Sequence, residues 1–256
     1  GKNIHTDVPV VGDAREALKL LLEEVQPRHH GEWRDWIESQ RNRVLEAALE
    51  DYPEWPEPYT IIKAIRKATN GEAIVTTDVG QHQMWTAQHF GFDYPSRWLT
   101  SGGLGTMGYG LPSAVGAKVG QPDLEVWTVV GDGGFQMSFN ELATAAQENL
   151  DINVAVINNG YLGMVRQWQD LFHQKNYSEV QILGPDFVKL AEAFGCTGIR
   201  VTKHEEIAPA IEKARNIKGP VVIDFVIEPE ANVYPMVPPG ASNSEMVHER
   251  FDQNDL

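Results

Sequence analysis

Two oxygen-bearing side chains, Asp132 and Asn159, each follow a strongly hydrophobic stretch. Residues 126–130 (VWTVV) precede the aspartate and residues 152–157 (INVAVI) precede the asparagine's segment, so both are expected at the carboxyl ends of buried parallel strands. Ligands bind at this edge of open α/β sheets. A carboxylate and an amide oxygen cannot complete an octahedron, and Mg²⁺ usually takes its other ligands from a backbone carbonyl, water and phosphate oxygens. The two residues therefore predict a magnesium site that binds a phosphorylated ligand.

Gly133 and Gly134 supply this predicted site with backbone N–H groups. They lie at the start of a helix expected to run through residues 140–145, where the helix dipole favours an anion. Asp132 alone would repel that anion, but Mg²⁺ between the carboxylate and a diphosphate removes the repulsion. The alternative is purely structural, because Asp-Gly and Asn-Gly pairs also form ordinary turns between α/β elements.

Five separated motifs resemble those of one enzyme family. The GDG and NN pair is similar to the metal and diphosphate motif of thiamine-diphosphate-dependent enzymes, and the other four narrow the resemblance to the acetohydroxyacid synthase (acetolactate synthase) catalytic large subunit. The motifs are residues 80–85 (GQHQMW), 101–112 (SGGLGTMGYGLP), 131–133 with 158–159 (GDG and NN), 162–168 (LGMVRQW) and 234–240 (YPMVPPG). The resemblance, from about residue 1 to residue 240, is to the carboxyl-terminal thiamine-diphosphate-binding region.

This resemblance implies an activity and a set of cofactors. Members of the family condense two pyruvates, or pyruvate and 2-oxobutyrate, to 2-acetohydroxy acids with loss of CO₂ in branched-chain amino acid biosynthesis. They use thiamine diphosphate and Mg²⁺, and the full-length subunit also binds FAD. They form dimers or tetramers, and a regulatory small subunit is a further partner. Another thiamine-diphosphate carboligase or pyruvate oxidase is the nearest alternative, and a noncatalytic cofactor-binding domain is an alternative of another class.

The resemblance also implies which residues bind the cofactor. Residues 80–82 would hold the diphosphate from the side opposite Gly133. The Gly105 carbonyl would accept a hydrogen bond from the aminopyrimidine, and Met107 would wedge between the two rings and hold them bent. The full cofactor-binding set is Gly80, Gln81, His82, Gly105, Met107, Asp132, Gly133, Gly134, Asn159, Tyr161, Leu162, Gly163 and Met164. The implied metal ligands are Asp132, Asn159 and the backbone carbonyl of Tyr161.

Met164 and Trp168 have two interpretations. They lie four residues apart on a short predicted helix, so they share one face. A methionine and an aromatic residue at this spacing usually belong to a core. The resemblance instead places both beside the reacting carbon, in the pocket for the second 2-oxo acid.

The sequence departs from the family at Gly134 and at Pro239, where some relatives carry a serine that contacts inhibitors. Gly134 stands where many relatives carry serine, so backbone N–H groups alone are expected to contact the diphosphate there. Family members also activate the cofactor with a glutamate from an amino-terminal domain of another subunit, and no residue of this chain matches it. The chain is therefore expected to hold half an active site, with no acid or base catalyst of its own, and to be inactive alone.

Residues 103–108 (GLGTMG) match the GxGxxG pattern of dinucleotide-binding proteins, and Asp123 or Glu125 lies near the position of a ribose-binding acid. A true fingerprint follows a long hydrophobic strand, whereas only residues 97–100 (RWLT) precede this one. Glu125 also starts a strand instead of ending one. A dinucleotide site is therefore disfavoured.

Helices and strands alternate from residue 59 onward. Strands are expected at residues 73–77, near 98, and at 126–130, 152–157, 197–201 and 221–227, with helices at 59–69, from 80, at 109–119, after 132, at 185–194 and at 205–216. This order predicts an α/β fold, a doubly wound parallel sheet with helices on both faces, which is the thiamine-diphosphate-binding fold.

Four segments are expected along the chain. Residues 1–25 resemble the last strand and helix of the family's central domain, with Asp13 as helix cap, so the chain is interpreted as truncated at its start. Residues 26–58 form an interdomain linker ending in a proline-rich stretch, and 59–241 form the diphosphate-binding and Mg²⁺-binding domain. Residues 242–256 form a flexible tail.

Composition excludes several classes of partner. The net charge of −15 argues against nucleic acid and anionic membrane, since both require clustered Lys and Arg. No stretch is long enough to span a bilayer, and a cytoplasmic enzyme fits the composition. The single cysteine, Cys196, lies in an apolar stretch and is expected in the core. The pair His29 and His30 has no neighbouring ligands and is expected to be solvated instead of metal-binding.

Overall fold

The structure, a computed structural model, describes residues 4–47 and 54–248 of the chain. It divides into two units, Gly1–Arg43 and Val44–Leu256, and each is described by itself. In the described part, no helix is both long and apolar enough to cross a membrane.

The first unit contains helix α1 (Ala14–Glu24) and the start of helix α2 (Gly31–Ala47). Asp13 caps α1 as predicted, because its carboxylate accepts hydrogen bonds from the backbone N–H groups of Arg15 and Glu16 at 3.0 and 3.2 Å. The strand expected at the very start falls on residues 1–3, which lie outside the described residues. The assignment of residues 1–25 to a central domain and of 26–58 to a linker stays a prediction.

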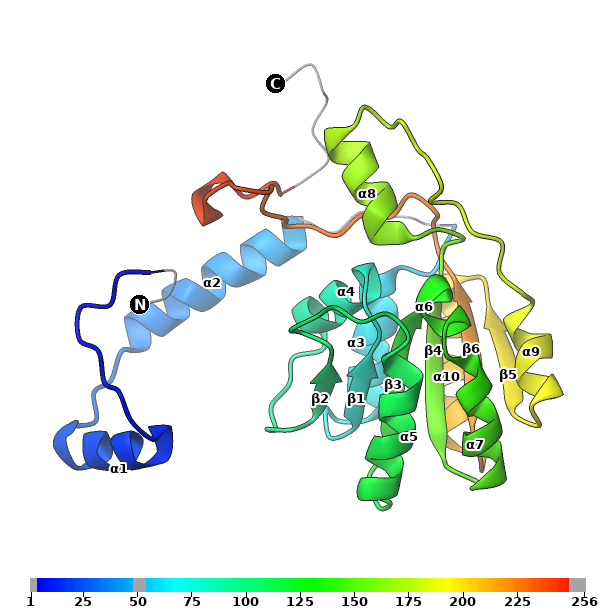
Figure 1. The fold of residues 1–256 in the computed structure, drawn as a ribbon, viewed down its shortest axis with the longest axis horizontal. Helices are drawn as coiled ribbons and strands as arrows, with labels where there is room; N and C mark the ends of the chain where they lie inside the picture. Colours follow the sequence, from blue (N-terminus) through cyan, green and yellow to red (C-terminus); the bar gives the residue numbers. More distant parts are fainter. Residues whose placement is uncertain (1–3, 48–53, 249–256) are drawn as a thin grey trace. The chain divides into compact units, whose positions relative to one another are not determined.

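Six parallel strands form one sheet in the second unit, in the order β2-β1-β3-β4-β6-β5 (Figure 1). They are β1 (Ile74–Thr77), β2 (Trp98–Thr100), β3 (Val126–Gly131), β4 (Ile152–Asn158), β5 (Thr197–Val201) and β6 (Val221–Val226). The inner strands β3, β4 and β6 are buried along almost their whole length, which explains why their sequences are apolar without alternation.

Helices cover both faces of this sheet. One face packs against α3 (Pro58–Ala68), α4 (Gln81–His89) and α10 (Ile207–Arg215), and the other against α5 (Gly110–Gly120), α7 (Leu142–Gln147) and α9 (Phe187–Ala193). Side chains of β3 alternate between the two cores: Trp127 and Val129 belong to the first, Val126 and Val130 to the second. The predicted doubly wound α/β fold is confirmed. Cys196 is buried in the second core, as expected.

The helix predicted after Asp132 is not continuous, and this corrects the expectation from sequence. A short helix α6 (Asp132–Gln136) comes first, then a 3-10 turn η1 (Phe139–Glu141), and only then α7. Ser138 has φ −142° and ψ 10°, outside helical values, so the run of helical hydrogen bonds stops there. The two glycines in α6 favour this early end because glycine is a poor helix former.

After β6 the chain continues through a segment that we call the strap, residues 228–236. The strap is hydrogen-bonded to helix α8 (Gly163–Phe172): Arg166 donates to the backbone carbonyls of Glu230 and Ala231 at 3.0 and 2.9 Å. Further on, Met236 pairs with Val247, and a 3-10 turn η3 (Asn243–Glu245) lies between them. Of the predicted flexible tail, residues 249–256 lie outside the described part of the chain.

Candidate functional site

Three helices begin at the carboxyl ends of three neighbouring strands. Helix α4 starts at Gln81 after β1, α6 starts at Asp132 directly after β3, and α8 starts at Gly163 after β4 (Figure 1). The first N–H groups of a helix have no partner within the helix, and the helix dipole places partial positive charge there. This edge of the sheet therefore favours an anion.

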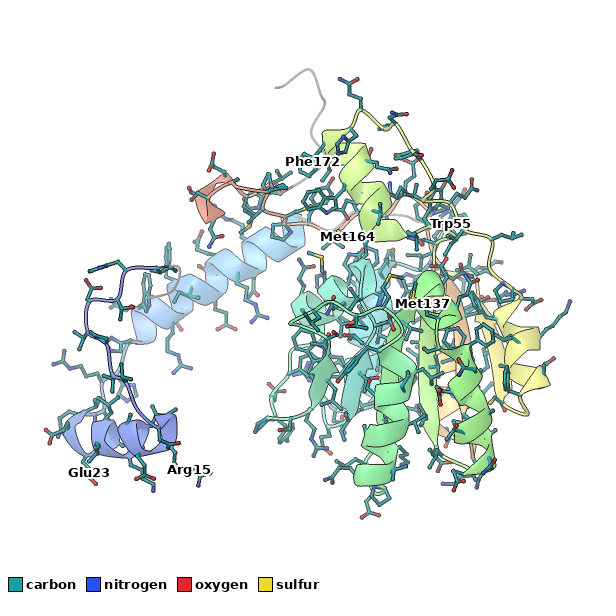
Figure 2. The ribbon with its side chains drawn as sticks, in the orientation of Figure 1. Arg15, Glu23, Trp55, Met137, Met164 and Phe172 are labelled. Carbon is teal, nitrogen blue, oxygen red and sulfur yellow. The ribbon has the colours of Figure 1, made fainter. Side chains whose placement is uncertain are left out.

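A cavity of about 510 Å³, including the part open to solvent, lies among these helix starts. Its lining contains every predicted cofactor residue except Gly105: Gly80, Gln81, His82, Met107, Asp132, Gly133, Gly134, Asn159, Tyr161, Leu162, Gly163 and Met164. Met164 lies on the first turn of α8, where Figure 2 labels it. Residues from four separate motifs therefore meet in one place.

Asp132 lies 3% exposed at the first position of α6. Its Oδ1 accepts a hydrogen bond from the N–H of Gly133 at 2.9 Å, and its Oδ2 accepts one from Gly160 at 2.7 Å. Burial raises the pKa of this carboxyl from 3.8 to about 7, although the hydrogen bonds from Gly160 and Gly133 oppose the shift. A carboxylate in such surroundings is stabilised by a bound cation.

Asn159 lies next to Asp132, because the Gly160 N–H that follows it donates to the aspartate. The Asn159 Oδ1 accepts from the N–H of Tyr161 at 3.1 Å, and its Nδ2 donates to Gln81 Oε1 at 3.3 Å. The backbone carbonyl of Tyr161 receives no hydrogen bond from any described residue. One carboxylate, one amide oxygen and one open carbonyl thus belong to residues that line the same cavity, a donor set that suits Mg²⁺.

His82 is buried in the cavity lining close to Gly131, where an added Cβ would lie 2.9 Å from His82 Nδ1. Burial lowers its pKa from 6.5 to about 4, while the nearby Asp78 acts in the opposite direction. The ring is therefore neutral near pH 7. Its Nε2 atom is buried without a hydrogen-bond partner among the described residues, which leaves one polar atom for a ligand.

Glycines form the walls at the positions of closest approach. A Cβ on Gly133 would lie 2.8 Å from Leu162 Cδ2, and a Cβ on Gly163 would overlap Gln81 Oε1. A Cβ on Gly134 would overlap the carboxylate of Asp78, so this structure gives a steric reason for glycine at this position. The close backbone, the unpartnered imidazole nitrogen and the cation ligands together fit a diphosphate with its metal.

Asp78 is a site residue that the sequence reasoning missed. It follows β1 as Asp132 follows β3, and it is fully buried. Its carboxylate accepts from the N–H groups of Val79 at 2.9 Å, Gly108 at 3.1 Å and Gly110 at 2.9 Å. These bonds fix the loop that carries Met107 into the cavity. The signal was present in the sequence as a second aspartate after a hydrophobic strand.

Two predicted residues lie outside this cavity. Gly105 adopts φ +65°, and a Cβ on it would lie 3.8 Å from a methyl of Val79, which does line the cavity. Trp168, on α8, packs against Phe172 with ring centroids 5.3 Å apart and is not part of the lining. The roles predicted for Gly105 and Trp168 therefore stay predictions.

No group of three or more His, Cys, Asp or Glu residues that could hold a metal is found within residues 4–47 and 54–248. The metal site predicted from sequence is of another kind, since it uses one carboxylate, one amide and one backbone carbonyl. Sites of this kind rely on phosphate oxygens and water for the remaining positions.

Comparison with known proteins bears on this geometry. Residues 78–225 match the family described as thiamine pyrophosphate enzyme, C-terminal TPP binding domain, where thiamine pyrophosphate is another name for thiamine diphosphate. The chain is 48% identical to the acetolactate synthase large subunit of Corynebacterium glutamicum over 96% of its length, which is 41% of that protein. It is 42% identical to the isozyme 3 large subunit of Escherichia coli, over 96% of this chain and 44% of that one. It is 40% identical to the mitochondrial catalytic subunit of Saccharomyces cerevisiae, over 96% of this chain and 37% of that one.

The chain spans about two fifths of the length of these relatives. The family match begins at Asp78 and ends at Phe225, so it includes the loops after β1, β3 and β4 that line the cavity. The resemblance inferred from five motifs is thus confirmed over almost the whole chain. The chain belongs to the family of thiamine pyrophosphate enzymes, as their C-terminal cofactor-binding domain.

Proposed function

We propose that this chain provides the diphosphate-binding and Mg²⁺-binding half of an acetolactate synthase active site. The observation that carries the proposal is the buried Asp132 carboxylate, with its raised pKa, hydrogen-bonded at 2.7 Å to the residue after Asn159. Three helix starts lie at this edge of the sheet, so the site suits an anion bound together with a cation. The similarity to acetolactate synthase large subunits supports the same conclusion.

Asp132, Asn159 Oδ1 and the Tyr161 carbonyl would hold Mg²⁺, with diphosphate oxygens and water as the other ligands. The backbone of Gly133 and Gly134 would approach the diphosphate closely. His82, neutral and with an unpartnered Nε2, would face the same group. The anion and the metal are expected to bind together because either one alone leaves a charge unbalanced in a partly buried site.

Bound thiamine diphosphate would supply a nucleophilic carbon and an electron sink for decarboxylation of a 2-oxo acid. Met107, Leu162 and Met164 line the cavity and would contact its rings, and the Gly105 carbonyl would accept a hydrogen bond from the aminopyrimidine. The apolar lining would exclude water from the reacting atoms.

The remaining parts of the reaction would come from outside this half-site. The lining contains the titratable side chains of Asp132 and His82. Asp132 is assigned to the metal and His82 to the diphosphate, so neither is assigned a proton transfer. An amino-terminal domain of another subunit in a homo-oligomer would supply the activating glutamate. The rest of the full-length subunit would bind FAD. Pyruvate and 2-oxobutyrate are the proposed substrates, with Trp168 in the pocket for the second one.

Complementation tests this function. The purified chain is mixed with a fragment of the Corynebacterium glutamicum relative that lacks the part matched here, together with thiamine diphosphate, Mg²⁺, FAD and pyruvate. We expect no acetolactate from the chain alone, formation with the fragment, and none when the chain carries Asp132→Ala. Acetolactate formation by the chain alone would contradict the half-site. Cofactor binding without activity in the mixture would favour a noncatalytic cofactor-binding domain.

A further inference from the structure

The amide of Gln81, on the first turn of α4, has a fixed orientation. Both hydrogens of its Nε2 are used, one donated to the backbone carbonyl of Ala231 at 2.8 Å and one to Gln167 Oε1 at 2.9 Å. A backbone carbonyl can only accept, so rotating this amide by half a turn would set two oxygens against each other. Gln81 Oε1 is therefore the atom left to face Asn159.

Gln167 is itself anchored to the strap. Its Nε2 donates to the carbonyl of Val233 at 2.8 Å, and its Oε1 accepts from the N–H of Val233 at 2.8 Å. A backbone N–H only donates and a backbone carbonyl only accepts, so the orientation of this amide follows from covalent chemistry. The anchor is rigid because the wholly buried Arg166 also binds the strap, at Glu230 and Ala231.

This series of hydrogen bonds ends at Asn159, a ligand of the proposed cation. Gln81 Oε1 accepts from Asn159 Nδ2 at 3.3 Å, which leaves Asn159 Oδ1 on the side of Tyr161 N–H, 3.1 Å away. Only the oxygen of an amide binds Mg²⁺. We propose that Gln81 is a positioning residue that turns Asn159 so that its oxygen, not its nitrogen, faces the cation. The cation is taken from the proposed function, whereas the fixed orientation of the three amides does not depend on it.

Burial makes any other orientation of these amides energetically costly. Gln81 is 3% exposed, Gln167 is 0% and Asn159 is 8%, so water cannot replace a misplaced hydrogen bond. Gly163 leaves space for the contact, since a Cβ there would overlap Gln81 Oε1. The side chain of Gln81 is thus directed to Asn159, Gln167 and the strap instead of to the diphosphate, for which only its backbone N–H remains.

A double-mutant cycle on the ligand-free full chain tests the fixed orientation. In Asn159→Asp, a carboxylate oxygen faces Gln81 Oε1, which cannot turn away. Gln81→Met removes the hydrogen bonds to Ala231 and Gln167 in both backgrounds, so it should lower the urea midpoint in both, but by less in the Asn159→Asp background, where it also removes the contact between two oxygens. If Gln81 is free to turn, it donates to the new carboxylate, and Gln81→Met lowers the midpoint at least as much in the Asn159→Asp background as in the wild type. That result would overturn the proposal.

Mg²⁺ affinity, measured with thiamine diphosphate as the probe, adds a functional readout. Loss of a residue that orients a metal ligand typically costs about 10–100-fold in metal affinity, so Gln81→Met should weaken Mg²⁺ binding by this amount. The loss should disappear in the Asn159→Asp background, where either oxygen can bind. Equal losses in both backgrounds would refute a positioning role. If the wild-type chain binds no Mg²⁺, the proposed function fails for the isolated chain, while the ligand-free cycle still decides the orientation.

Gln88→Met is the matched control. Gln88 lies on the same helix and donates to a strap carbonyl, that of Tyr234 at 3.1 Å, but no hydrogen bond joins it to Asn159. The Gln88→Met variant should leave the Mg²⁺ affinity within about twofold of wild type.

If Gln81→Met does not fold, NMR on the wild type replaces the double-mutant cycle. The Gln81 side-chain NH₂ should show nuclear Overhauser contacts to Ala231. Contacts from that NH₂ to Asn159 in their place would overturn the proposal.

Discussion

Asp78 and Asp132 occupy equivalent places at the ends of neighbouring strands, β1 and β3, yet their surroundings differ. Both are buried, and both accept backbone hydrogen bonds. Asp78 accepts three, from residues on two separate segments, and so joins the end of β1 to the loop that carries Met107. Asp132 accepts two, and its pKa is raised to about 7.

The difference separates a carboxylate that the protein itself satisfies from one that is a candidate for ligand binding. Three N–H groups provide partial positive charge that satisfies Asp78 within the protein. Asp132 is less well compensated, and it lies in the cavity lining, where a ligand can reach it. A buried carboxylate that the protein itself does not fully compensate is a candidate for cation binding.

The largest expected effect is the loss of ligand binding in Asp132→Ala. Since removal of a residue that merely orients a ligand costs about 10–100-fold, removal of the carboxylate should weaken Mg²⁺-dependent thiamine diphosphate binding by more than about 100-fold. The free energy of unfolding should change by less than about 1 kcal/mol, because loss of two hydrogen bonds is offset by removal of a buried charge. Calorimetric titration and urea unfolding measure the two quantities. A large loss of stability would place Asp132 in the same class as Asp78.

Asp78→Ala should lower stability more than Asp132→Ala does and weaken ligand binding less. It leaves three backbone N–H groups without their acceptor, so we expect unfolding to become easier by about 2 kcal/mol. Urea denaturation of the ligand-free chain measures this change. Binding should weaken less than in Asp132→Ala, because Asp78 acts only through the loop that it holds. An Asp78→Ala chain as stable as wild type would remove the distinction between the two aspartates.

The pH dependence of Mg²⁺ binding is the next effect in size. With the pKa of Asp132 raised to about 7, the carboxyl is protonated below that pH, and Mg²⁺ must displace the proton. Affinity should fall about tenfold per pH unit below pH 7 and level off above pH 8. Titrations at pH 6, 7 and 8 measure it, and constant affinity from pH 6 to 8 would contradict the assignment.

Stability of the metal-free chain should depend on the same group with the opposite sign. A raised folded pKa means that the folded state binds the proton more tightly than the unfolded state. The contribution of Asp132 to stability is then present below about pH 4 and is lost as the pH rises through about 7. The pKa of His82 is lowered to about 4, so this residue adds stability as the pH rises from 4 to 6.5 and masks part of the loss. The stability of the wild type is therefore compared with that of Asp132→Asn, by urea unfolding, between pH 6.5 and 8.

Gly134→Ala tests the contact between residue 134 and Asp78. The new methyl overlaps the Asp78 carboxylate, and such overpacking typically costs about 1–3 kcal/mol in the free energy of unfolding. Gly116→Ala on α5 is the control, because a Cβ there meets nothing within 4 Å and alanine is the better helix former. In an Asp78→Ala background the cost of Gly134→Ala should shrink. Additive costs would show that the two positions are not in contact.

Much of the fold follows from local sequence. The apolar runs before Asp132 and Asn159 are typical of strands buried on both faces, and the alternation of helix and strand then predicted the doubly wound sheet. That Asp132 and Asn159 come together was predictable for the same reason, since parallel strands bring their carboxyl ends to one edge. Asp13 was recognisable as a cap because capping depends on residues within three positions.

Long-range contacts account for what sequence did not reveal. Asp78 was visible as an aspartate after a hydrophobic strand, but its partners Gly108 and Gly110 lie about thirty positions away, so its role in holding their loop could not be read locally. The orientation of Gln81 depends on Gln167 and Ala231, which are 86 and 150 positions distant. The early end of α6 was likewise missed, because the apolar residues beyond it fit a continuous helix equally well.

The most direct test of the account is whether cofactor binding by the wild-type chain requires the metal. Thiamine diphosphate is titrated calorimetrically into the full chain at pH 8, with Mg²⁺ and with chelator, and inorganic diphosphate is titrated in parallel. We predict binding of both ligands with Mg²⁺ and none detectable with chelator, because Asp132 then repels the diphosphate. Equal affinity with and without Mg²⁺ would contradict the claim that Asp132 acts through a shared cation.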